Sequence, residues 1–251
     1  MKDRIYAIIV AGGTGSRMKS SVPKQYLDLR GKPVLQYSIE KFLENELIDA
    51  CIIVAHKMYH KDIEDMTRGI AGKNIYIVEN GTERIDSVKN GLDKALSLEE
   101  SYDNSENGGM AYVMIHDGAR PCINSELLHR LITGVMTDEA VVPAVPSKDT
   151  IRLADDNGYV ISTPRRDSVW NVQTPQTFKM APLMEAFNKY MSSKDNVQVT
   201  DDAMIWEMYN ERPVRIIMGD YSNIKLTTSE DLEPVKLFLK KTKKCLTWHN
   251  M

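Results

Sequence analysis

The chain has 251 residues, a length that suits one large α/β domain, alone or with a small appendage. Hydrophobic residues make up 42% of it and charged residues 27%, a globular balance that excludes a long disordered region. The net charge of −3 gives no global attraction to nucleic acid, so local cations must hold any phosphate ligand.

Apolar runs alternate with helical patterns through the first half of the chain. The expected strands, in chain order, are 5–10, 50–55, 74–78 and 111–116, and the expected helices are 34–43, 87–98 and 125–135. The polar stretch 99–109 has no period and predicts a solvated surface loop. Strands that alternate with helices indicate βαβ units. We therefore expect an α/β fold, a Rossmann-like, mostly parallel sheet flanked by helices, in a single domain over residues 1–251.

The alternation breaks after a further apolar run at 141–146. Two β-prone runs, 150–153 and 159–162, flank Asn157-Gly158, a pair that favours a hairpin because its turn needs positive φ. The segment 147–167 is therefore predicted to be a projecting β-hairpin arm, which packs on its own subunit or reaches a second one. Near the end, Thr227 and Glu230 have the spacing of a capping box that opens a helix through about residue 240.

Nothing in the sequence indicates a membrane span or a metal centre built from cysteine and histidine. The longest apolar run, 5–11, is far shorter than the roughly 20 residues that cross a bilayer, and glycines follow it at once. The three cysteines, Cys51, Cys122 and Cys245, lie far apart and have no metal-ligand spacing. An odd, sparse set suits a reducing compartment, so we expect a cytoplasmic protein.

The first predicted strand leads into a glycine-rich segment, residues 11–18, with the sequence AGGTGSRM. Backbone N–H groups in such a turn can cradle phosphates, although the pattern is neither a Walker A sequence nor the dinucleotide fingerprint. By itself the turn is as often a tight connection as a phosphate site. Arg17 and Lys24 follow in the same loop, and fixed cations stabilise the charge that develops on the α-phosphorus during nucleotidyl transfer. We therefore interpret the segment as a triphosphate site rather than a turn with two solvated cations.

Asp117 ends a predicted strand, and ligands of open α/β sheets bind beyond the carboxyl ends of strands. Its carboxylate is a candidate ligand for Mg²⁺, or a similar divalent cation, that bridges triphosphate oxygens. The alternative is a carboxylate that caps a loop. Arg120 is a candidate bidentate clamp on an acceptor phosphate, or simply an ion-pair partner of Asp117. His116 is interpreted as a packed residue at the strand end, without a catalytic role.

These segments resemble the 2-C-methyl-D-erythritol 4-phosphate cytidylyltransferases, which have the nucleotide-diphospho-sugar transferase type of fold. The similar motifs cover nearly the whole chain: 11–18, 23–25, 81–88 with GTER and SV, 116–121 (HDGARP), 170–176 with W and QTPQ, 200–203 (TDDA) and 223–225 (NIK). The resemblance implies transfer of CMP from CTP to a small polyol phosphate, with release of pyrophosphate, in the non-mevalonate isoprenoid precursor pathway.

The resemblance also implies roles for further residues. Those implied to bind the nucleotide are Ala11, Gly12, Gly13, Gly15, Gly81 and Ser87. Thr150 and Arg166 are implied to contact the acceptor phosphate from the arm of a partner subunit, in a homodimer that exchanges arms. Lys225 is implied to be an acceptor-side cation that acts in catalysis with Arg17 and Lys24. Without the resemblance, these arm and late-chain residues are ordinary surface residues.

Two positions depart from the family pattern. Arg165 stands where many relatives carry an acidic residue, which leaves the choice between Arg165 and Arg166 open. Ser168 stands where a glycine is common.

The reaction expected is an in-line attack by the acceptor's phosphate oxygen on the α-phosphorus of CTP. A phosphate dianion is already nucleophilic, and the sequence has no Ser-His or Cys-His constellation, so no covalent enzyme intermediate is expected. The nearest alternative is a ribitol 5-phosphate cytidylyltransferase. The residues Gly118, Ala119 and Trp170 favour the methylerythritol substrate over that alternative. A hexose 1-phosphate nucleotidyltransferase is disfavoured by the segment 173–176. A non-catalytic nucleotide-binding regulator is disfavoured because the three chemically important residues are present: Arg17, Lys24 and Asp117.

Overall fold

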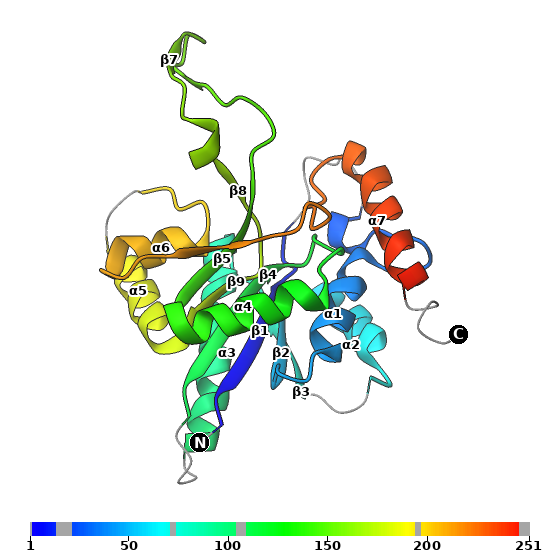
Figure 1. Cartoon of the computed structure of the whole chain (residues 1–251). Helices are drawn as coiled ribbons and strands as arrows, with labels where there is room; N and C mark the ends of the chain where they lie inside the picture. The colour runs from blue at the N-terminus through cyan, green and yellow to red at the C-terminus, as the bar shows by residue number, and fades with distance from the viewer. Residues whose placement is uncertain (1, 14–21, 71–73, 104–108, 194–196, 246–251) are drawn as a thin grey trace.

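The structure, a computed structural model, describes residues 2–13, 22–70, 74–103, 109–193 and 197–245. An eight-stranded sheet lies at its centre, with the strand order β10-β5-β9-β4-β1-β2-β3, and β8 pairs with β5 (Figure 1). The strands of this sheet are β1 (Arg4–Val10), β2 (Ala50–Ala55), β3 (Asn74–Glu79), β4 (Ala111–Asp117), β5 (Ala140–Pro146), β8 (Trp170–Val172), β9 (Gln176–Lys179) and β10 (Arg215–Met218).

The sheet is mostly parallel, as the sequence predicts. Strand β1 pairs in parallel with β2 and β4, β2 with β3, and β10 with β5. Two short strands run against this direction: β9 is antiparallel between β4 and β5, and β8 is antiparallel along β5. The alternation of strands and helices therefore predicts the fold class correctly. It does not predict the two antiparallel strands, β8 and β9.

Helices cover both faces of the sheet because successive side chains of each central strand point to opposite faces. In β1, Ile5 and Ile9 pack with helices α1, α2 and α4, whereas Tyr6 and Ile8 pack with α3, α5 and α6. The helices are α1 (Val34–Glu44), α2 (His60–Thr67), α3 (Arg84–Asp103), α4 (Ser125–Asp138), α5 (Met180–Ser192), α6 (Asp202–Tyr209) and α7 (Leu232–Cys245). Within the described parts of the chain, no helix is both long and apolar enough to cross a membrane.

The prediction of a surface loop over residues 99–109 is wrong for residues 99–103, which are helical. Helix α3 continues to Asp103, and Glu99 accepts hydrogen bonds from Arg4 Nε at 2.8 Å and from the Tyr6 hydroxyl at 2.7 Å. These contacts fix the end of α3 on the first strand. The local pattern cannot reveal them, because the partners lie more than ninety residues apart in the sequence.

The predicted capping box is displaced by one residue. Thr228 is the N-cap and Asp231 its partner, whose carboxylate accepts from the backbone N–H of Thr228 at 2.8 Å. A short 3₁₀ turn, Ser229–Asp231, then leads into α7, which runs to Cys245 rather than ending near residue 240. Thr227 lies outside the box, although its own backbone N–H also donates to Asp231.

The predicted arm is a hairpin that extends away from the sheet (Figure 1). Its strands, β6 (Leu153–Ala154) and β7 (Val160–Ser162), are shorter than expected and pair antiparallel around an irregularity. Of the two turn residues, only Gly158 takes positive φ, at 84°. Asp155 closes the turn, because its carboxylate accepts from the backbone N–H groups of Asn157 and Tyr159 at 3.0 and 2.9 Å.

The register of the parallel strands determines where a site can form. Val10 and Asp117 are partners at the carboxyl ends of β1 and β4. Glu79, the last residue of β3, is the partner of Ala55 at the end of β2. The glycine-rich segment, the 117–120 turn and the 80–83 turn therefore leave the sheet at the same edge, which is where open α/β sheets bind ligands.

Candidate active site

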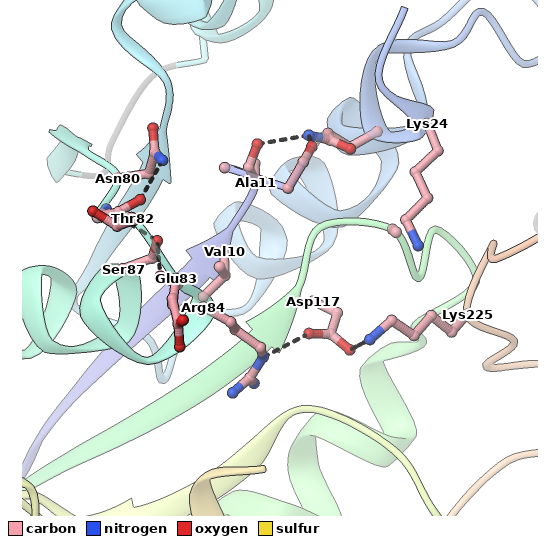
Figure 2. A pocket seen from close by; sticks show the side chains of 15 residues that line it. Val10, Ala11, Lys24, Asn80, Thr82, Glu83, Arg84, Ser87, Asp117 and Lys225 are labelled. Carbon is pink, nitrogen blue, oxygen red and sulfur yellow. Dashed lines mark hydrogen bonds and ion pairs between the residues drawn. The ribbon is translucent and has the colours of Figure 1, made fainter. Parts of the chain in front are cut away.

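A cavity of about 300 Å³ opens at this carboxyl edge (Figure 2). The segment 80–87 lies on one side of it, and Lys24 and Lys225 lie on the other. The predicted site residues on its wall are Ala11, Gly12, Gly13, Lys24, Gly81, Ser87, Asp117 and Lys225. Segments from the start, middle and end of the chain thus meet in one place, as the sequence predicts.

The beginning of the glycine-rich segment is tightly held. Gly12 has no room for a side chain, because a Cβ there would lie 2.5 Å from the Cβ of Asn80. Gln25 is almost fully buried, and its Nε2 donates to the carbonyl oxygens of Ala11 and Gly13, each at 2.7 Å. This side-chain amide fixes the backbone next to Lys24, which immediately precedes it in the chain.

The opposite wall is a close turn between β3 and α3. A Cβ on Gly81 would lie 2.1 Å from the Cβ of Asp86, so only glycine fits. The Ser87 hydroxyl accepts from the backbone N–H of Gly81 at 3.1 Å and donates to the carbonyl of Glu83 at 3.0 Å. Ser87 therefore shapes the wall by holding the turn in place.

Asp117 is the centre of a charged cluster at the floor of the cavity. Its Oδ2 lies 2.9 Å from Lys225 Nζ and 3.6 Å from Arg120 Nε, and its Oδ1 lies 3.5 Å from Arg84 Nε. Figure 2 shows Arg84 and Lys225 approaching the carboxylate from opposite sides. Burial favours the neutral acid, but Arg84, Lys225 and Arg120 hold the pKa of Asp117 well below its usual range. The carboxylate is therefore ionised at neutral pH.

Arg84 is anchored on the far side of the cluster. Its Nη1 and Nη2 donate to the two carboxylate oxygens of Asp202, each at 2.8 Å, and the Asp202 side chain is almost fully buried. Gln176 accepts from the backbone N–H of Asp202 at 3.1 Å and donates to Asp201, the N-cap of α6. The first residue of α3 is thereby joined to the first turn of α6.

A second cavity of about 250 Å³ lies beside the first and shares Arg84, Asp117 and Lys225 with it. Arg120 lines this second cavity, where its Nη1 donates to the carbonyl of Asn223 at 2.8 Å. Its Nε has no hydrogen-bond partner among the described residues. Two cavities with common cations can hold two phosphate-bearing molecules next to each other.

His116 is a packed strand-end residue, in agreement with the sequence interpretation. It is fully buried; its Nδ1 lies 3.1 Å from the Thr174 hydroxyl and its Nε2 lies 3.3 Å from the carbonyl of Arg120. The carbonyl of Arg120 can only accept, so the neutral imidazole carries its proton on Nε2 and Nδ1 accepts from the Thr174 hydroxyl, which itself accepts from the backbone N–H of Asp117 at 3.0 Å. Burial lowers the pKa of His116 to about 4, which keeps the ring neutral at pH 7.

The two predicted arm residues contact each other but line neither of these cavities within the described part of the chain. Arg166 Nη2 donates to the Thr150 hydroxyl at 2.8 Å, and both residues are exposed. Arg165 instead pairs with Asp167. Arg166 is therefore the arginine that lies with Thr150.

Two predicted residues, Gly15 and Arg17, lie outside the described residues. The sequence does not single out Gln25 and Arg84 as site residues, although both belong to its motifs, 23–25 and 81–88. The contact of Gln25 with Ala11 could be expected from a buried polar residue next to the loop. The pairing of Arg84 with Asp202 spans 118 residues and had no local signal.

The residues around Asp117 do not form a site for Mg²⁺ held by the protein alone. A dication here would have one carboxylate against three nearby cations, whereas Mg²⁺ prefers several oxygen ligands in octahedral geometry. No group of three or more His, Cys, Asp or Glu side chains suited to a metal ion occurs among the described residues.

Comparison with known proteins gives one consistent family. The model of the 2-C-methyl-D-erythritol 4-phosphate cytidylyltransferase family matches residues 5–241. A protein with that name from Lachnospira eligens is 43% identical over 238 residues, which cover 93% of this chain and 98% of the relative. One from Lachnoclostridium phytofermentans is 38% identical over 231 residues, covering 92% of this chain and 94% of the relative.

Solved structures give the same result. The crystal structure of 4-diphosphocytidyl-2C-methyl-D-erythritol synthase from Anaerococcus prevotii superposes with a TM-score of 0.79 at 32% identity, covering 96% of this chain and all of the other. A 2-C-methyl-D-erythritol 4-phosphate cytidylyltransferase from Francisella tularensis superposes with a TM-score of 0.74 at 28% identity, covering 94% and 99%.

Proposed function

This chain belongs to the 2-C-methyl-D-erythritol 4-phosphate cytidylyltransferase family and transfers CMP from CTP to 2-C-methyl-D-erythritol 4-phosphate, and we propose that its two adjacent cavities hold these two substrates. The first cavity takes CTP, and the second takes the acceptor phosphate. The observation that carries this assignment is that both cavities share Arg84, Asp117 and Lys225.

The nucleotide half of the proposal uses the two close turns of the first cavity. Ala11, Gly12 and Gly81 line the first cavity, and their backbone groups would read the edge of the pyrimidine. The close contacts of Gly12 with Asn80 and of Gly81 with Asp86 hold these turns in place. Gly13 and Gly15 would continue the phosphate cradle, and Ser87 holds its turn in place. Lys24, together with Arg17 outside the described residues, would stabilise the charge on the α-phosphorus.

The chemical step is an in-line displacement. An oxygen of the acceptor phosphate attacks the α-phosphorus of CTP, a new P–O bond forms, the bond to the β-phosphate bridging oxygen breaks, and pyrophosphate leaves. Lys225 and Arg120 would hold the acceptor phosphate, since both line the second cavity. Catalysis then consists of positioning and electrostatic stabilisation, and no proton needs to be removed from the nucleophile.

A divalent cation, Mg²⁺ or a similar ion, is proposed to accompany the triphosphate, as is general for nucleotidyl transfer. It would supply charge neutralisation on the phosphate oxygens. Because the described residues do not form a metal site themselves, the ion is assigned to the nucleotide rather than to a protein cage. A cytoplasmic location remains a prediction from the sparse cysteines, of which Cys51 and Cys122 are buried.

The arm is proposed to reach a second copy of the chain, in a homodimer that exchanges arms. An isolated two-stranded hairpin is marginal in water, and this one carries strongly exposed apolar side chains: Leu153, Tyr159, Val160 and Ile161. A C₂ partner would cover them and receive Thr150 and Arg166 next to its acceptor cavity.

The direct displacement is tested by isotope exchange. Labelled pyrophosphate is incubated with CTP and the protein, with and without acceptor. A direct transfer predicts no label in CTP unless acceptor or product is present. Exchange at the full rate without acceptor would show a cytidylyl-enzyme intermediate and would contradict the mechanism.

A further inference from the structure

Three cations from distant parts of the chain converge on the carboxylate of Asp117. Arg84 begins helix α3, Arg120 follows β4, and Lys225 precedes the 3₁₀ turn before α7. With the buried Asp202, which pairs with Arg84, the cluster has three positive and two negative charges. A further carboxylate, Asp201, lines the second cavity, but at the junction itself three cations share the one carboxylate of Asp117, an arrangement that suits phosphate groups and not a free dication.

Lys225 is the cation that depends most on Asp117. Arg84 is held separately by two hydrogen bonds of 2.8 Å to Asp202, and Arg120 is held by a backbone carbonyl at 2.8 Å. Among the described residues, the Asp117 carboxylate is the only one paired with Lys225 Nζ. A lysine has four rotatable bonds, so without this partner its ammonium group would sample many positions.

Asp117 is itself rigidly placed. It is the last residue of β4, in register with Val10 of β1, and its backbone N–H donates to the Thr174 hydroxyl at 3.0 Å. It is 8% exposed. A carboxylate on such a fixed backbone is a suitable anchor for a flexible cation.

We propose that Asp117 is a positioning residue that holds the Lys225 ammonium group at the boundary between the two cavities, and not a ligand of a divalent metal ion. One N–H of Lys225 is used by Asp117, and the other two remain available for the acceptor phosphate. This inference rests on the proposed assignment of the cavities and replaces the metal-binding role predicted from the sequence.

The direction in which Asp117→Asn changes the affinity for phosphate tests the proposal. Removing the negative charge of Asp117 makes the cluster more positive. If net charge alone determined phosphate binding, Asp117→Asn would strengthen it. If Asp117 positions Lys225, the same variant weakens phosphate binding, because the ammonium group loses its place.

We expect Asp117→Asn to raise the KM for 2-C-methyl-D-erythritol 4-phosphate about tenfold or more and to lower kcat by about 10²-fold, the loss typical of a misplaced group. The Mg²⁺ concentration for half-maximal rate at saturating CTP should stay unchanged. Asp65→Asn removes a carboxylate from the surface of α2 and is the matched control, with kinetics expected to equal those of the original protein. A raised Mg²⁺ requirement, or a lowered acceptor KM, would overturn the proposal.

A double-mutant cycle tests whether Asp117 acts through Lys225. Lys225→Met removes the ammonium group but keeps most of the side-chain length. After Lys225→Met, the further change Asp117→Asn should have little effect on the acceptor KM, because the group that it positions is already absent. Effects that multiply independently would contradict the proposal.

A second variant covers the case in which Asp117→Asn does not fold. Asp117→Glu keeps the charge and the ability to bind a metal ion but moves the carboxylate by one methylene group. The positioning role predicts a raised acceptor KM for this variant, and an unchanged KM would overturn it.

Binding of inorganic phosphate, measured by calorimetry without CTP, gives a readout that does not need turnover. Phosphate should bind about tenfold more weakly to Asp117→Asn, or to Asp117→Glu, than to the original protein, in line with the expected change in KM. Equal or tighter binding would refute the positioning role. If the original protein makes no product from CTP and the acceptor, the proposed function fails, whereas the phosphate comparison still decides the role of Asp117.

Discussion

The side-chain amide of Gln25 donates to the carbonyl oxygen of Ala11 at 2.7 Å, and the same nitrogen donates to Gly13 at 2.7 Å. One buried side chain therefore holds the two carbonyls that flank Gly12. It also links the glycine-rich segment to Lys24, its neighbour in the chain. The geometry of the proposed triphosphate site should depend on this amide although Gln25 itself carries no charge.

The variant Gln25→Glu tests this dependence with almost no change of shape. It places an acceptor against two carbonyl acceptors, so two buried hydrogen bonds are lost, at a cost of about 1–3 kcal/mol for each unsatisfied group. We expect kcat/KM for CTP to fall by about 10- to 100-fold, which corresponds to about 1.4–2.8 kcal/mol. Steady-state kinetics measure this effect. The exposed Gln198→Glu is the control, and an unchanged kcat/KM in a folded Gln25→Glu protein would refute the role.

Lys24→Ala should lower turnover by roughly 10²–10³, the usual loss of one electrostatic donor to the transition state. Arg17→Ala should give a loss of the same size. Circular dichroism and the thermal midpoint of Lys24→Ala should match those of the original protein, because the change shortens a partly exposed side chain at the start of the 3₁₀ turn Lys24–Tyr26. The exposed Lys61→Ala on α2 serves as the control for loss of a surface cation. Full turnover in Lys24→Ala would remove this residue from the mechanism.

Because of His116, the free energy of unfolding should decrease as the pH is lowered below neutrality. Its pKa is about 4 in the folded protein, where burial opposes protonation, and about 6.5 when unfolded. Between these values the unfolded state binds a proton that the folded state does not, so acidification favours unfolding, by at most about 1.4 kcal/mol per pH unit. Denaturant titrations at pH 7 and pH 5 measure the effect.

The variant His116→Gln isolates this contribution. A glutamine can accept from Thr174 and donate to the carbonyl of Arg120, as the neutral imidazole does, but it does not titrate. The difference in stability between pH 7 and pH 5 should therefore become smaller. His129→Gln, at an exposed histidine, should leave it unchanged. An equal pH dependence in His116→Gln and the original protein would contradict the assignment.

Subunit complementation tests the exchange of arms. Inactive Lys24→Ala chains and inactive Arg166→Ala chains are mixed under conditions that allow subunit exchange. In a heterodimer with shared sites, both defects fall in one site and the other site is intact, so about a quarter of full activity should return.

The control mixture is Lys24→Ala with Lys225→Ala, since both residues line the same cavity of one chain and every site keeps a defect. Recovery should be absent there. If the Lys24→Ala and Arg166→Ala mixture also stays inactive, or if the active enzyme is a monomer, the shared site is wrong.

The sequence predicts the central strands well and the site only in part. Strand β2 has the predicted bounds, because a short, purely apolar run between polar residues is stable only when both of its faces are buried in the sheet. The described part of the glycine-rich segment and the 116–121 segment lie at one edge of the sheet, as predicted, because a strand end fixes the location of each. The ion pair between Asp117 and Arg120 is one of the two interpretations that the sequence offers, and the structure contains it. The contacts of Asp117 with Arg84 and Lys225 could not be predicted, because only the folded chain brings positions 84, 117 and 225 together.

Two predictions are wrong, for different physical reasons. The polar pattern around Glu99 predicts a loop, but its hydrogen bonds with Arg4 and Tyr6 of β1 keep it in helix α3. The capping box was displaced by one residue, because neighbouring threonines and acidic residues offer two registers and the backbone conformation of Thr228 selects one. The first error comes from contacts between distant parts of the chain, and the second from a choice between two local registers.

The central claim is tested most directly by a panel of donors and acceptors. Four nucleoside triphosphates are each combined with 2-C-methyl-D-erythritol 4-phosphate, ribitol 5-phosphate and a hexose 1-phosphate, with Mg²⁺ present, and pyrophosphate release is followed. The account predicts that CTP with 2-C-methyl-D-erythritol 4-phosphate has the highest kcat/KM, by at least about tenfold over every other pair, a transition-state difference of about 1.4 kcal/mol. Comparable turnover with UTP or a purine triphosphate, or a higher kcat/KM with ribitol 5-phosphate, would contradict it.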